Sequence, residues 1–138
     1  MEYTAVSNLK ISGAPVGWHI DHALLVITVI INAIENSNPV EFSSKPSLVK
    51  WYVFICRKIP RGRIQSPKAV RPDSNFTPAD IHRHFEICYA SIKKLNHLDQ
   101  NNFFKHPYFG HLNLKSSIKF MGIHTKHHLS IIDDILKT

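Results

Sequence analysis

The stretch TPADIHRHFEICYASIKKLNHL (77–98) determines the fold that we expect for this chain. Thr77 can cap a helix, Pro78 suits its first position, and Asp80 completes a capping box. The apolar residues follow a 4-3-4-3 spacing that is typical of the seam of a helical bundle: Ile81, Phe85, Cys88, Ile92 and Leu95. The stretch therefore predicts a long amphipathic helix in a bundle, with His82 and His84 exposed.

Two further helices are predicted before it and one after it. The first runs from about Pro15 to Asn36 and contains the apolar run ALLVITVIINAI (23–34). Its length favours a helix over a strand, and the run is too short to span a bilayer, so we interpret it as a core helix. A shorter helix is expected over 46–59, with Trp51, Tyr52 and Phe54 in the bundle, and a last helix over about 114–136.

The predicted fold class is therefore all-α, an antiparallel four-helix bundle that forms a single domain over residues 1–138. Loops are expected at 36–46, 60–76 and 99–113, and only about fourteen residues precede the first helix. With 43% apolar and 20% charged residues, the chain can bury a core. Its two cysteines, Cys56 and Cys88, make no disulfide framework and suit a reducing compartment. The N-terminus lacks the pattern of a signal peptide, so we expect a cytoplasmic protein.

The positive charge is concentrated in one predicted loop. The formal net charge is +7, and six basic residues follow one another without an intervening acid: Arg57, Lys58, Arg61, Arg63, Lys68 and Arg71. A local basic loop favours an anionic ligand over general nucleic-acid binding. Arg61 and Arg63 are our candidates for cofactor binding, and the alternative is a solvated, mobile surface.

Three histidines lie within five residues in HTKHH (124–128). Continuing the apolar stripe of the last helix places His124 and His128 on its core-facing side and His127 nearer its edge. Two neutral imidazoles spaced i, i+4 on one face can chelate one cation. An HxxxH pair alone is a weak signal of a metal site. The alternative is that these histidines are ordinary polar side chains, at the surface or beside other buried groups.

A third ligand is available in GWHIDH (17–22), from either His19 or His22. Three histidines with open coordination positions are typical of a catalytic metal site and not of a closed structural one. The site is not that of the zinc proteases with an HExxH helix, because Thr125 occupies the position of the glutamate.

Four short segments, taken together and in this order, resemble the DinB-like family in its small, mostly uncharacterised bacterial branch: GWHIDH (17–22), IPRG (59–62), HPYFG (106–110) and HTKHHL (124–129). The resemblance implies a four-helix bundle with an abbreviated N-terminal helix. It also implies a metal triad of His22, His124 and His128, in which HALL (22–25) favours His22 over His19. Relatives with known activity are metal-dependent enzymes, several of them thiol transferases.

The function that we expect is that of a metal-dependent transferase or hydrolase holding a divalent transition metal: Zn, Ni, Fe or Mn, with Zn preferred. Its expected partners are a small-molecule substrate, with an anionic thiol as one candidate, and a second copy of the chain in a homodimer. No membrane and no nucleic acid is expected. The alternative is a non-catalytic helical bundle that acts as a binding or dimerisation module.

Overall fold

The computed structural model of the protein describes residues 3–62 and 66–137. Within these ranges, the helices are α1 (Val16–Glu35), α2 (Leu48–Cys56), α3 (Pro78–Lys94) and α4 (Leu114–Leu136). Short 3₁₀ helices occupy Pro39–Glu41, Lys68–Val70 and Leu95–His97. Two strands, β1 (Phe103–His106) and β2 (Gly110–Asn113), lie between α3 and α4 in the sequence.

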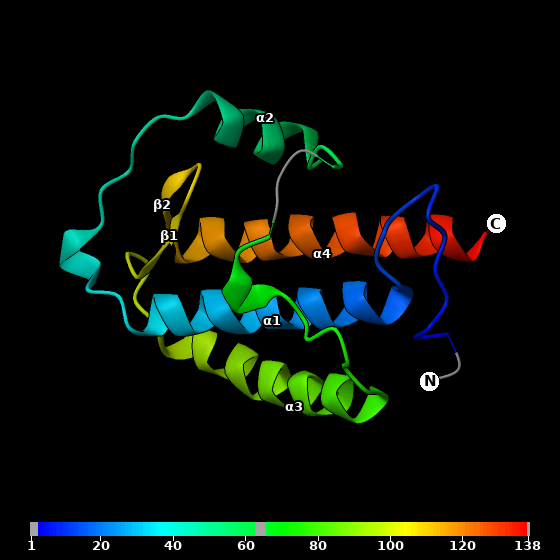
Figure 1. Cartoon of the computed structure of the whole chain (residues 1–138). Coiled ribbons are helices and arrows are strands. Elements are labelled where there is room, and N and C mark those ends of the chain that lie inside the picture. Colours follow the sequence, from blue (N-terminus) through cyan, green and yellow to red (C-terminus); the bar gives the residue numbers. More distant parts are fainter. Residues whose placement is uncertain (1–2, 63–65, 138) are drawn as a thin grey trace.

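The long helices form a layer with α1 in the middle. α1 packs against α3 on one side and against α4 on the other (Figure 1). The main core lies at the C-terminal half of α1, where Ile30, Ile31 and Ile34 pack among residues of α4 and the hairpin. Length and hydropathy alone would allow α1 to cross a membrane, but half of its apolar window is buried inside the protein, and a core helix meets the same criterion.

The N-terminal end of α1 is held by a close approach that only glycine permits. A Cβ atom added at Gly17 would lie 2.6 Å from the Phe76 ring and 2.9 Å from the Thr4 carbonyl oxygen. Phe76 precedes α3, whose start has the predicted capping box, in which the Thr77 and Asp80 side chains each accept a hydrogen bond from the other residue's backbone N–H. The glycine therefore lets α1, the N-terminal segment and the entry to α3 meet.

The prediction of a purely all-α four-helix bundle is wrong, because the expected loop at 99–113 contains an antiparallel β-hairpin. Phe103 pairs with Asn113 and His106 with Gly110, which leaves a three-residue turn. Gly110 has a positive φ of 71°, as such turns require of one residue. The strands have four residues each, too short to give a recognisable alternation in the sequence.

The shorter helix α2 is also placed differently from the prediction. It lies beyond α4 at the edge of the molecule (Figure 1) and does not form a wall of a bundle. Val53 is its one buried residue, whereas Trp51 and Tyr52, which we expected in the bundle, are exposed. Apolar periodicity showed that α2 has an apolar side, but not whether that side is covered.

Candidate metal centre

Three histidines from two helices, α1 and α4, meet where these helices pack against each other. One potential ligand atom each of His22, His124 and His128 lies within 4.8 Å of the other two. His22 and His128 are buried and His124 is half-buried. The helical spacing of four residues places His124 and His128 on one face of α4, and the crossing with α1 brings His22 to them.

The orientation of His22 is fixed by the loop that precedes α3. Its Nδ1 lies 2.6 Å from the carbonyl oxygen of Val70, so Nδ1–H donates and Nε2 keeps its lone pair. On one side its ring stacks on Trp18, with 4.8 Å between the centroids. A hydrogen bond from the second ring nitrogen to a carbonyl is the usual way in which proteins orient a metal-binding histidine.

His128 is oriented by a second histidine. The Nδ1 atoms of His128 and His19 lie 2.9 Å apart, and Nε2 of His19 lies 3.0 Å from the Ser12 hydroxyl oxygen. If Nε2 of His128 serves as a ligand, its Nδ1–H must donate to Nδ1 of His19. His19 is then the tautomer whose Nε2–H donates to Ser12. The spacing in the sequence leaves His19 and His22 as alternative ligands. The structure places His22 in the cluster, whereas His19 lies in hydrogen-bond contact with His128 and outside the cluster.

His124 differs from its two neighbours because its Nδ1 is buried without a hydrogen-bond partner among the described residues. An unsatisfied buried polar atom costs about 1–3 kcal/mol, so natural proteins seldom leave one without reason. A cation bound at this Nδ1 would remove the cost. The donor set therefore fits a divalent transition metal, which imidazole nitrogens bind well.

The electrostatic environment keeps these imidazoles neutral. Burial, together with the neighbouring histidines, lowers the pKa of His124 to about 3 and that of His128 to about 2. Burial also lowers the pKa of His22, against the opposing effect of the Val70 carbonyl. At neutral pH every ring therefore offers a lone pair, as metal ligands must.

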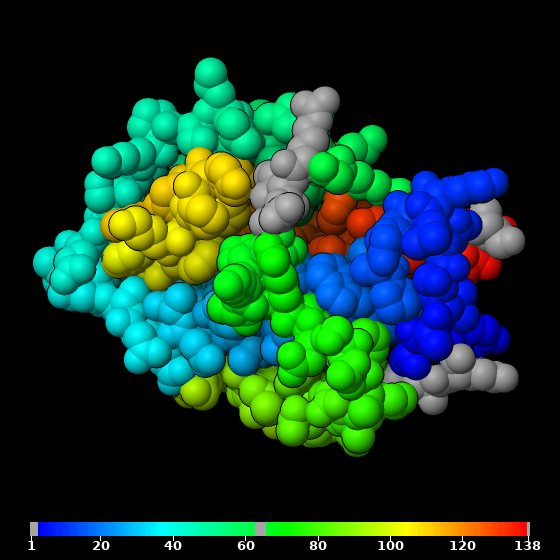
Figure 2. Space-filling model, viewed as in Figure 1, coloured from blue at the N-terminus to red at the C-terminus, as the bar shows by residue number. Residues whose placement is uncertain are grey.

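The predicted cofactor-binding residue Arg61 lies near the cluster but is already engaged on α4. Its guanidinium forms an ion pair with Asp134 at 2.8 Å and donates to the Ser130 hydroxyl at 2.9 Å. Both contacts hold the segment after α2 against α4. Figure 2 shows atoms of α4 recessed between this segment and the start of α1. Arg63, the second predicted residue, lies outside the described residues, and a cofactor-binding role for either arginine stays a prediction.

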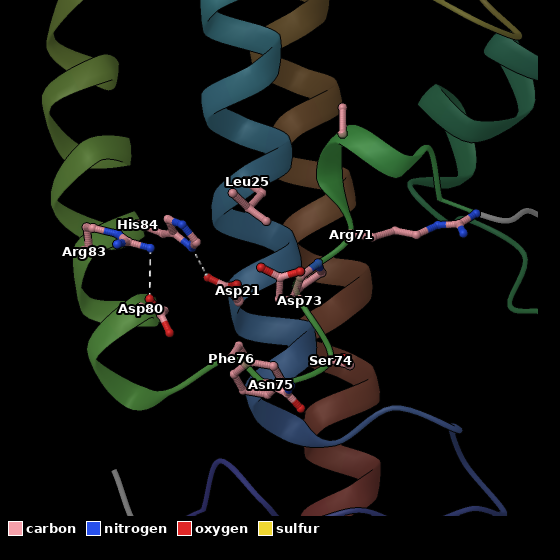
Figure 3. A pocket seen from close by; sticks show the side chains of 12 residues that line it. Asp21, Leu25, Arg71, Asp73, Ser74, Asn75, Phe76, Asp80, Arg83 and His84 are labelled. Carbon is pink, nitrogen blue, oxygen red and sulfur yellow. Dashed lines mark hydrogen bonds and ion pairs between the residues drawn. The ribbon is translucent and has the colours of Figure 1, made fainter.

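A polar groove that the sequence analysis missed lies on the side of α1 that turns toward α3. It has a volume of about 540 Å³, and its lining includes Asp21, Asp73 and His84 (Figure 3). Asp21 is only 1% exposed and accepts a hydrogen bond from Nδ1 of His84 at 2.6 Å. His84 was expected to be exposed but is half-buried. The residue pair lies 63 positions apart, so no local spacing could have indicated it.

Comparison with known proteins assigns the chain to a family. The fold and the site geometry define the class of protein: a helical protein with a cluster of three histidines. The family model of DUF1569, described as a protein of unknown function, matches residues 18–134, so the chain belongs to that family. The resemblance to the DinB-like family is thereby corrected, since the match is to DUF1569. Neither a curated protein nor a solved structure matches the chain.

Proposed function

We propose that this protein is a metal-dependent enzyme that holds a divalent transition metal ion through His22, His124 and His128. The observation that carries the proposal is the convergence of three imidazoles, with one potential ligand atom each within 4.8 Å of one another, and with Nδ1 of His124 buried and without a hydrogen-bond partner in the described part of the chain. Three histidines leave coordination positions open, which suits catalysis better than a closed structural site.

A bound ion of this kind lowers the pKa of a coordinated water or thiol and so supplies a nucleophile near neutral pH. The chain's own contribution is orientation. The Val70 carbonyl orients the His22 ring, and His19 orients the His128 ring, each through a hydrogen bond to Nδ1. This leaves the Nε2 atoms of both rings free to bind the ion. His127 is half-buried, and its ring centroid lies 5.2 Å from that of His128.

The class of reaction within this proposal is a transferase or a hydrolase. The expectation of a thiol S-transferase relied on the DinB-like resemblance and loses that support. Metal-assisted hydrolysis needs only the ion and a water, and it therefore becomes the first activity to test. Zinc is the preferred metal because a three-histidine site with open positions is common among zinc enzymes.

The test is elemental analysis of protein purified without chelator or histidine tag, beside a His124→Ala/His128→Ala variant. The matched control is His82→Ala/His97→Ala, which removes two exposed histidines. We expect about one equivalent of metal in the wild type and the control, none in the first variant, and turnover only in the loaded forms. Absence of metal after reconstitution with Zn²⁺, Ni²⁺ and Mn²⁺ would refute the proposal.

A second candidate is a non-catalytic dimerisation module. It is favoured by the outer face of α3, where Phe85, Tyr89 and Ile92 are exposed. A contiguous apolar face on a helix commonly marks a protein contact. Sedimentation equilibrium of the wild type and of Phe85→Ser/Tyr89→Ser tests it, since a dimer formed through α3 dissociates in the variant.

A further inference from the structure

Among the described residues, the largest set of exposed apolar side chains on one helix belongs to α2, and the proposed metal site does not use it. Leu48 is 89% exposed, Ile55 69% and Trp51 59%, and Tyr52 lies beside them. Val53 turns inward and Phe54 is half-buried in the core, so the helix is attached along one edge. The outer face of this nine-residue helix carries no charged side chain.

The residues flanking this face are basic. Lys45 precedes α2, and Arg57 and Lys58 follow it, all exposed. Lys50, the one charged residue within the helix, lies on its inner edge and reaches the Lys45 carbonyl. From residue 42 to residue 72 the sequence has eight lysines and arginines and no aspartate or glutamate, whereas the net charge of the whole chain is +7. The remainder of the chain is therefore close to neutral, and the excess positive charge belongs to α2 and to the segments that flank it in the sequence.

We propose that α2 with its flanking lysines and arginine docks on an anionic lipid surface. In such an arrangement the helix lies in the plane of the interface with Leu48 and Ile55 inserted among the acyl chains. Trp51 and Tyr52 fit the headgroup level, where amphipathic aromatic rings are favoured. Lys45, Arg57 and Lys58 lie at the ends of the helix, positioned to reach anionic headgroups.

Charge complementarity favours this occupant over the alternatives. A second copy docking face to face through α2 would bring two strongly basic segments together, and like charges oppose such a contact. A nucleic acid would satisfy the cations but would leave the aliphatic face of Leu48 and Ile55 in water. An anionic bilayer offers both an apolar interior and negative headgroups.

This inference goes beyond the proposed function and does not depend on a metal. It differs from the expectation that no membrane is a partner. That expectation rested on the length of the apolar runs, whereas binding to a membrane surface depends on which side chains the fold leaves exposed. Only the position of α2 outside the helical layer exposes this face (Figure 1).

The test is co-sedimentation of the full chain with vesicles of phosphatidylcholine, with or without phosphatidylglycerol. We expect binding to the anionic vesicles and a blue shift of tryptophan emission that is lost in Trp51→Phe. Leu48→Ser/Ile55→Ser should weaken binding by about tenfold or more. Lys45→Gln/Lys58→Gln should weaken it about fivefold for each lysine removed.

The control is Ile87→Ser on α3, which removes an apolar side chain that is 46% exposed, outside the Phe85 and Tyr89 face and on the far side of the helical layer from α2 (Figure 1). It should bind vesicles like the wild type. Circular dichroism should show the same helicity in every variant, since all these positions are exposed. Absence of vesicle binding by the wild type would overturn the proposal, as would equal binding by the Leu48→Ser/Ile55→Ser variant. A lipid-free dimer abolished by that variant would assign the face to a second copy instead. Salt-dependent retention on DNA without vesicle binding would assign the basic segment to nucleic acid.

Discussion

His19 is the residue through which the proposed metal site can be tested most sharply, because the structure makes it a positioning residue and not a ligand. His19→Phe removes the acceptor that lies 2.9 Å from Nδ1 of His128 while keeping an aromatic ring in the buried position. His19→Gln keeps an acceptor oxygen. Ser12→Ala removes only the far end of the chain of hydrogen bonds.

The expected loss of metal affinity follows from the cost of leaving the Nδ1–H of His128 without an acceptor. In His19→Phe the Nδ1–H of His128 stays buried without a partner when Nε2 holds the ion, which costs about 1–3 kcal/mol. Such a cost corresponds to about a 5- to 150-fold weaker metal affinity, in the range of about 10- to 100-fold typical of losing an outer hydrogen bond. His19→Gln should recover most of the affinity, and Ser12→Ala should cost less than His19→Phe.

The assay is competition titration with Zn²⁺, together with the visible spectrum of the Co²⁺-substituted protein. The spectrum of His19→Phe should match that of the wild type, because the three ligands are unchanged. A changed spectrum would make His19 a ligand. An unchanged affinity, with the wild type binding about one equivalent, would refute the positioning role and leave the metal site standing.

Three further perturbations have outcomes that the structure determines. Burial lowers the pKa of several histidines below 6.5, so the unfolded chain takes up their protons first. The histidines concerned are His19, His106, His124 and His128. Their contribution to the free energy of unfolding is fully present above pH 6.5 and is lost as the pH falls toward the folded pKa values. In urea titrations without metal, the loss at pH 5 should be about 1–2 kcal/mol per histidine. A pH-independent urea midpoint between pH 7 and 5 would contradict this. Gly17→Ala should lower the free energy of unfolding by about 1–3 kcal/mol, because its Cβ would overlap the Phe76 ring, whereas Gly122→Ala, with nothing within 4 Å, should raise it by up to about 1 kcal/mol; thermal unfolding that ranks the two variants the other way would exclude this packing. Arg61→Ala should cost less than about 1 kcal/mol, since its ion pair with Asp134 is solvent-exposed, and a larger loss by urea unfolding would mean that the segment after α2 is held more firmly than this contact implies.

The elements with strong local signals could be predicted from the sequence. α1, α3 and α4 lie within a few residues of their expected bounds, because caps and helical periodicity act over neighbouring residues. The same periodicity correctly turned His124 and His128 toward α1. The hairpin was missed because its strands are short, although a three-residue turn with Gly110 at its end was a readable signal.

The sequence by itself determined which residues form helices and which face of α4 carries the histidines, since both follow from the rotation of one helix about its axis. Only the tertiary structure decided the contacts between distant residues: His22 on the Val70 carbonyl, His19 against His128, and Asp21 with His84. Only it decided, too, that the apolar face of α2 stays open to solvent. A residue's own helix sets the direction of its side chain. Whether another residue lies in contact with that side chain depends on how the chain folds back over many tens of residues.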